Sequence, residues 1–145
     1  MKILFLCTGN FYRSRFAELL FNHVASCQGL EARACSLGLA VERGFENIGP
    51  LSAHAAARLA VLGVKKSDEW DRMPRQAQFD DFIPFEKIIA LDEEEHRPIM
   101  HDRFPEFESA VEYKNVHDLD QIGPESALPQ IEKIVADLVT EISAK

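Results

Sequence analysis

Residues 7–14 (CTGNFYRS) constrain this chain more than any other stretch of its sequence. They follow a short apolar run over residues 1–6, which is typical of a buried parallel strand. From Ser14 to Ala25, apolar residues recur at helical spacing. The stretch is therefore predicted to be a loop between a strand and the N-terminus of a helix, where unpaired backbone N–H groups favour an anion.

This loop has the residues needed to bind a tetrahedral oxyanion. Its amides can surround the oxygens while Arg13 binds two of them as a fork and the sulfur of Cys7 lies below the central atom. A helix N-terminus and a nearby arginine both favour a thiolate, so we expect Cys7 to be a nucleophile. Ser14 can donate its hydroxyl to that sulfur, and Gly9 and Asn10 tolerate a left-handed backbone. The predicted substrate-binding residues of the loop are Thr8, Gly9, Asn10, Phe11, Tyr12 and Ser14.

The stretch resembles the low-molecular-weight protein tyrosine phosphatase family, whose loop reads Cys-x-Gly-Asn-x-Cys-Arg-Ser-Pro after the first strand. The matching residues are Cys7, Gly9, Asn10, Arg13 and Ser14. The resemblance implies hydrolysis of phosphate monoesters, most of all protein phosphotyrosine, through a phosphocysteine intermediate and without metal or cofactor. It also implies a phosphorylated protein or a small phosphate monoester as partner.

Two positions in and after the loop depart from the family pattern. Tyr12 stands where the family has a second cysteine, and Arg15 stands where it has a proline. Arg15 is expected either to attract anionic substrates or to point into solvent. In the resembled family, members that act on phosphotyrosine have an apolar residue at the position of Phe11, and members that act on phosphoarginine have threonine. Phe11 therefore favours phosphotyrosine.

Phosphate-ester hydrolysis also needs an acid to protonate the leaving oxygen. The resembled family carries this aspartate in an Asp-Pro dipeptide before its last helix. Asp118 falls on that position, but Leu119 replaces the proline, and Asp120 is a rival; both aspartates could also be ordinary turn residues. The family places aromatic residues directly after the dipeptide, whereas residues 119–122 (LDQI) contain none. We expect Asp118 to be the general acid.

Strands and helices alternate along the rest of the chain. Further strands are expected at residues 31–37, 85–92 and within 113–120, and helices at 14–27, 53–62, from Glu93, and in a last helix opened by Pro129. Ser52 and Asp92 are expected to cap two of these helices. The pattern predicts a single α/β domain with a parallel sheet over residues 1–145. The resemblance implies that this sheet has four strands in the order 2-1-3-4 and helices on both faces, which makes three layers.

Two further residues lie on or after the second predicted strand. In the resembled family the loop after this strand forms one wall of the substrate cleft and often carries an aromatic residue. Phe45 is the candidate here, with the alternative that it anchors the loop to the body of the protein. Cys35 is expected to be a buried small residue.

Composition limits the partners and the compartment. The net charge of −8 argues against nucleic acid, and no apolar run is long enough to span a bilayer. No segment resembles a signal peptide. Three cysteines give no disulfide framework, and a working thiolate needs a reducing compartment, so a cytoplasmic location is expected. His96 and His101 lack matching ligands, so no metal site is expected. The protein is expected to be a monomer or a weak homodimer.

Two other functions fit parts of the same sequence. Thiol-dependent arsenate reductases on this fold need a pair of cysteines downstream of the loop, and this chain has no cysteine after Cys35. A non-enzymatic module that binds phosphate or phosphoproteins is the other alternative. The presence of both Cys7 and Arg13 argues against such a module.

Because Tyr12 removes the neighbouring thiol that could trap an oxidised Cys7 as a disulfide, we expect peroxide to oxidise Cys7 irreversibly faster than it does in relatives that have both cysteines. After prolonged peroxide and then dithiothreitol, mass spectrometry should find Cys7 as sulfinic or sulfonic acid. A Tyr12→Cys variant should instead form a disulfide that dithiothreitol reopens. Full recovery of the Cys7 thiol in the wild type would contradict this expectation.

Overall fold

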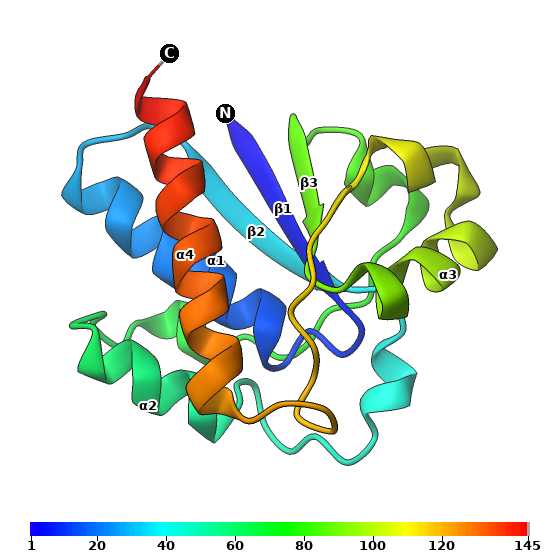
Figure 1. The fold of residues 1–145 in the computed structure, drawn as a ribbon, viewed down its shortest axis with the longest axis horizontal. Coiled ribbons are helices and arrows are strands. Elements are labelled where there is room, and N and C mark those ends of the chain that lie inside the picture. Colours follow the sequence, from blue (N-terminus) through cyan, green and yellow to red (C-terminus); the bar gives the residue numbers. More distant parts are fainter. Residues whose placement is uncertain (145) are drawn as a thin grey trace.

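A parallel sheet of four strands forms the centre of the computed structural model, which describes residues 1–144 (Figure 1). The strands are β1 (Lys2–Cys7), β2 (Arg33–Gly38), β3 (Lys87–Ala90) and β4 (Glu112–Tyr113). Their order is β2-β1-β3-β4, which confirms the predicted order. The central strand β1 pairs on both sides, with Phe5 opposite Ser36 of β2 and Ile89 of β3.

Helices cover both faces of this sheet, as predicted. They are α1 (Arg13–Cys27), α2 (Ala53–Val61), α3 (Glu93–Arg103) and α4 (Pro124–Ser143). In Figure 1, α1, α2 and α4 lie to one side of the strands and α3 to the other. Alternate residues of β1 enter two separate cores: Ile3 and Phe5 join the core that contains α1 and α4, and Leu4 and Leu6 join the core that contains α3.

Local signals set most of the helix ends. The Ser52 hydroxyl accepts from the backbone N–H groups of His54 and Ala55 at the start of α2, and the Asp92 carboxylate accepts from that of Glu95 in α3. Gly29, with a φ of 70°, follows the end of α1. Both predicted caps are confirmed.

The last helix begins at Pro124, so the prediction that Pro129 opens it was wrong. At the first helical position a proline loses only an N–H that has no partner within the helix. Pro129 lies further inside and does remove a backbone bond. Ala127 and Leu128, which both precede the predicted start at Pro129, are already buried in the helix, so core packing favours the longer helix.

Cys35 is exposed, which corrects the expectation that it is buried. It lies on β2, an edge strand in which Ala34 and Ser36 face inward and Cys35 faces outward. Helix α3 packs against β4 at the other edge of the sheet and leaves this part of β2 uncovered.

Arg15 is fully buried, so neither expectation for it was correct. Its Nη1 donates to Glu18 Oε1 at 2.8 Å, one turn along α1. Its Nη2 donates to the backbone carbonyl oxygens of Glu69 and Arg72. Arg72 in turn donates from Nη2 to the same Glu18 oxygen at 3.2 Å. Arg15 therefore fastens the segment around residues 69–72 to the first turn of α1.

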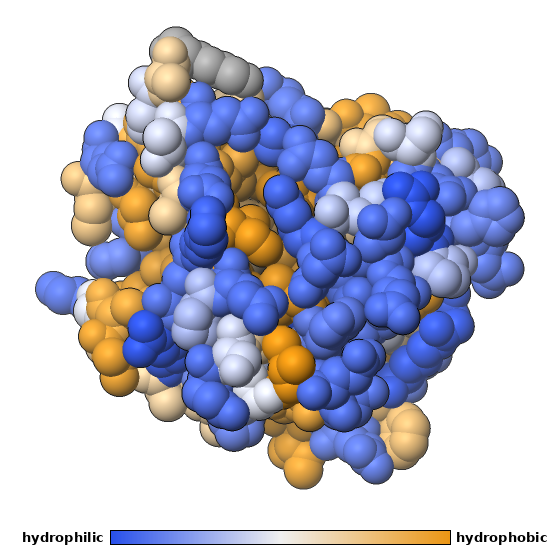
Figure 2. All heavy atoms as spheres, in the orientation of Figure 1, coloured by the Kyte–Doolittle hydropathy of each residue, from blue (hydrophilic) through white to orange (hydrophobic). Residues whose placement is uncertain are grey.

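Charged and polar residues cover most of the face shown in Figure 2, with small apolar patches between them. None of the helices in residues 1–144 combines the length and the apolar character needed to cross a membrane.

Because Arg15 joins the first turn of α1 to the segment around residues 69–72, removing its side chain should destabilise the fold. We expect Arg15→Ala to lower the free energy of unfolding by about 3 kcal/mol, because within residues 1–144 it leaves the buried Glu18 carboxylate with Arg72 as its one remaining cation. Lys133→Ala, which breaks an exposed ion pair with Asp137, should cost less than about 1 kcal/mol. Urea unfolding measures both, and equal losses would contradict the account of Arg15.

Candidate active site

The loop from β1 to α1 opens onto a small pocket of about 80 Å³. It lies at the carboxyl end of β1, the side on which open α/β sheets hold their sites. The pocket brings together three residues predicted to be catalytic, Cys7, Arg13 and Asp118. Its complete lining is Cys7, Gly9, Phe11, Tyr12, Arg13, Asn47, Ser52, Asp118 and Leu119.

Asn10 has the left-handed backbone that the sequence predicted, with a φ of 53°, and its side chain is buried behind the loop. Its Nδ2 donates to Ser14 Oγ and to Ser36 Oγ, both at 2.9 Å. The Ser14 oxygen lies 2.9 Å from the Cys7 sulfur. Because Ser14 Oγ accepts from Asn10, its own proton is available to be donated to that sulfur.

Groups outside the loop fix the orientation of the Asn10 amide. Its Oδ1 accepts from Arg72 Nη1 at 3.1 Å and from the backbone N–H of Arg75 at 3.0 Å. Ser36 Oγ, which accepts from Asn10, donates to Glu18 Oε1 at 2.6 Å. The buried cluster that contains Arg15 thus supports the loop of residues 7–14 from behind.

The Arg13 side chain is 2% exposed, and both of its terminal nitrogens have partners. Nη1 donates to the Val116 carbonyl oxygen at 2.9 Å, and Nη2 donates to Glu95 Oε2 at 2.7 Å. Asp118 Oδ2 lies 3.5 Å from Nη2, and Asp92 Oδ2 lies 3.7 Å from Nη1. Burial alone would lower the pKa of Arg13, but the negative charges of Cys7 and Glu95 raise it above its ordinary value.

Glu95 is a site residue that the sequence analysis missed. One carboxylate oxygen, Oε2, accepts from Arg13, from the Thr8 hydroxyl and from His96 Nε2. Burial would raise the pKa of Glu95, yet the hydrogen bond from His96 and the charge of Arg13 hold it far below its ordinary range. Glu95 belongs to a run of three glutamates, and its place three residues after Asp92 is the signal that could have singled it out.

His96 is a neutral donor in this arrangement. Its Nδ1 accepts the backbone N–H of Asp92 at 3.1 Å, so the proton of a neutral ring lies on Nε2 and points to Glu95. Burial lowers the pKa of His96 below its ordinary value, which favours this neutral form.

The two candidate acids differ in position. The Asp118 side chain is 44% exposed, lines the pocket and accepts the backbone N–H of Leu119 at 2.9 Å. Asp120 is exposed and does not line the pocket. The geometry therefore favours Asp118 for proton transfer.

Phe45 does not reach the pocket. Its side chain is 83% exposed, so it neither lines the site nor anchors the loop. From the same loop Asn47 lines the pocket instead, with its amide close to the backbone of Gly9. No motif or spacing in the sequence pointed to Asn47.

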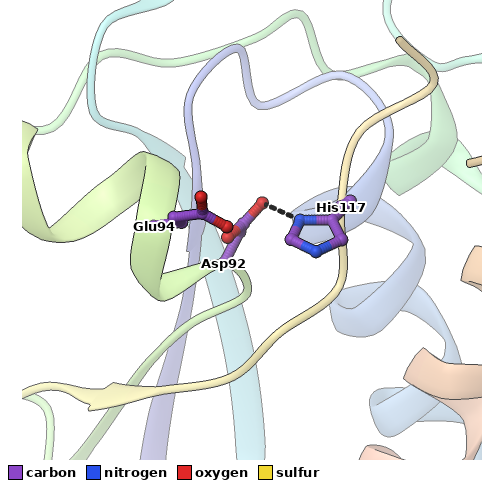
Figure 3. A group of neighbouring side chains, drawn as sticks. All are labelled: Asp92, Glu94 and His117. Atoms are coloured by element: carbon purple, nitrogen blue, oxygen red, sulfur yellow. Dashed lines mark hydrogen bonds and ion pairs between the residues drawn. The ribbon is translucent and has the colours of Figure 1, made fainter. Parts of the chain in front are cut away.

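Figure 3 shows Asp92, Glu94 and His117, whose ligand atoms lie within 4.8 Å of one another. His117 Nδ1 lies 2.9 Å from Asp92 Oδ2. The guanidinium of Arg13 already compensates the charge of Asp92 and would repel a cation placed there. We therefore assign no metal to this group.

A parallel α/β domain that places a thiol and a buried arginine in one loop between a strand and a helix is typical of cysteine-based phosphatases. The family model described as low molecular weight phosphotyrosine protein phosphatase matches residues 2–143. The chain therefore belongs to this family, and membership supports phosphatase activity.

Solved structures with the same fold share about a fifth to a quarter of their residues with this chain. YfkJ from Bacillus subtilis is 24% identical, with a TM-score of 0.82 over 99% of this chain and 95% of that one. A low molecular weight protein tyrosine phosphatase from T. tengcongensis is 20% identical, with a TM-score of 0.80 over 97% of this chain and 99% of that one. A YwlE arginine phosphatase with a phosphorylated active-site serine is 18% identical, with a TM-score of 0.76 over 99% of this chain and 96% of that one. No curated protein matches the sequence.

Proposed function

We propose that this protein hydrolyses phosphate monoesters, with protein phosphotyrosine as its substrate class, through a phosphocysteine on Cys7. The observation that carries the proposal is the pocket that holds a nucleophile, a guanidinium and a carboxylic acid, namely Cys7, Arg13 and Asp118. Family membership supports the reaction class.

In the first step the Cys7 thiolate attacks phosphorus, and the S–P bond forms as the ester P–O bond breaks. The loop amides and Arg13 stabilise the charge on the phosphoryl oxygens. Asp118, in its protonated form, gives its proton to the leaving oxygen. Asp118 lines the same pocket as Cys7, which supports this role.

In the second step Asp118, now ionised, takes a proton from water as the water oxygen attacks phosphorus. The S–P bond breaks and the electron pair returns to sulfur. The hydroxyl of Ser14, 2.9 Å from Cys7 Sγ, stabilises the thiolate as it leaves. Inorganic phosphate is the product, and no metal takes part.

Apolar side chains at the pocket support an aromatic substrate. Phe11 and Leu119 both line it, and a tyrosine ring could pack between them. Phe11 stands where relatives that act on phosphoarginine have threonine. An arginine phosphatase nevertheless shares this fold, so phosphoarginine is the substrate to compare directly.

The test is hydrolysis of para-nitrophenyl phosphate in EDTA, at mildly acidic pH, by the wild type and three variants. We expect Cys7→Ser to abolish turnover and Asp118→Ala to lower kcat by about 10²–10⁴-fold, the usual range for a lost general acid. Asp120→Ala, the matched control, should stay within about twofold of wild type because an exposed carboxylate outside the pocket transfers no proton.

A loss confined to Asp120→Ala would contradict the assignment of Asp118. Wild-type protein that binds phosphate tightly and turns over no ester would instead indicate a phosphate-binding module. Parallel assays with phosphotyrosine and phosphoarginine peptides would overturn the proposed substrate class if phosphoarginine had the higher kcat/KM.

A further inference from the structure

A carboxylate from another element bridges the two ends of the catalytic loop. Glu95 lies in the first turn of α3, and its Oε2 accepts both from Thr8, next to Cys7, and from Arg13 Nη2 at 2.7 Å. Arg13 Nη1 is bound to the Val116 carbonyl oxygen at 2.9 Å. One edge of the guanidinium is therefore held by the protein itself, which fixes the plane in which the arginine can meet a phosphate.

Negatively charged side chains surround Arg13, although the proposed function requires this site to bind an anion. Three carboxylates face one guanidinium: Glu95 at 2.7 Å, Asp118 at 3.5 Å and Asp92 at 3.7 Å. His96 packs against Glu95 and is neutral, so it does not offset that charge. His117 contacts Asp92 and not Glu95.

We propose that Glu95 is a positioning residue that aligns Arg13 and, through its negative charge, weakens the binding of inorganic phosphate. This inference rests on the proposed function, because phosphate is the product of that reaction. A carboxylate bound to the arginine reduces the attraction that the site offers to a dianion, so the product dissociates more readily. The contact between Glu95 and Arg13 therefore both aligns the guanidinium and weakens its attraction for phosphate.

A substitution that removes the charge of Glu95 but keeps the shape of its side chain separates its effect on the alignment of Arg13 from its effect on phosphate affinity. Glu95→Gln keeps an oxygen that can accept from Arg13 and Thr8 but removes the negative charge. Glu95→Asp keeps the charge. Glu93→Gln is the matched control, because it removes one charge from the same helical turn, where Glu93 pairs at the surface with Arg97 at 2.8 Å.

The measurement is calorimetric titration of each purified full-length protein with inorganic phosphate, together with phosphate inhibition of para-nitrophenyl phosphate hydrolysis. We expect Glu95→Gln to bind phosphate about tenfold more tightly, with a lower KM and no rise in kcat, because one repelling charge is gone. Glu95→Asp should remain closer to wild type than Glu95→Gln. Glu93→Gln should stay within about twofold because its charge is exposed and screened.

Unchanged or weaker phosphate binding in Glu95→Gln would overturn the inference, as would an equal gain in Glu93→Gln. If Glu95→Gln does not fold, Glu95→Asn removes the same charge, and the same two outcomes in that variant would overturn the inference. The titration needs no turnover. A protein that hydrolyses no ester would therefore refute the proposed function while the effect of Glu95 on phosphate affinity is still decided.

Discussion

The buried guanidinium of Arg13 connects the catalytic loop to two segments that are distant in the sequence. It reaches Asp92 and Glu95 at the start of α3, and Val116 and Asp118 in the connection from β4 to α4. A buried cation is costly unless opposite charges and hydrogen bonds surround it, so these segments must fold together for Arg13 to be stable. The same contacts bring the proposed general acid, Asp118, into the pocket that Cys7 lines.

A second buried polar group supports the loop from behind. Asn10 adopts a left-handed backbone, and its amide joins Ser14, Ser36 and the segment that carries Arg72. Because Ser14 Oγ accepts a hydrogen bond from the Asn10 amide, the proton of Ser14 is free to be donated to the Cys7 sulfur. Arg15, in the position where the family has proline, extends this support to the segment around residues 69–72.

The strand–loop–helix around Cys7 could be predicted because its signals are local: an apolar strand, residues that permit a tight loop, and a helical pattern beginning at Ser14. The strand order came from the family resemblance. The environment of Arg15 could not be predicted, because its carbonyl partners lie more than 50 residues away along the chain. Glu95 was missed because three successive glutamates look alike until the packing of α3 turns one of them toward Arg13. Two prolines suit a helix start equally well, and only core packing decides between Pro124 and Pro129.

The central claim is that the phosphoryl group passes through Cys7. The most direct test mixes the Asp118→Ala variant with para-nitrophenyl phosphate, stops the reaction with denaturant at short times, and maps the modified residue by mass spectrometry. Without the base that activates water, breakdown of the intermediate should be slow, so one phosphoryl group is expected on Cys7. Release of nitrophenol with a phosphoryl group on another residue, or on none at any time, would contradict the account.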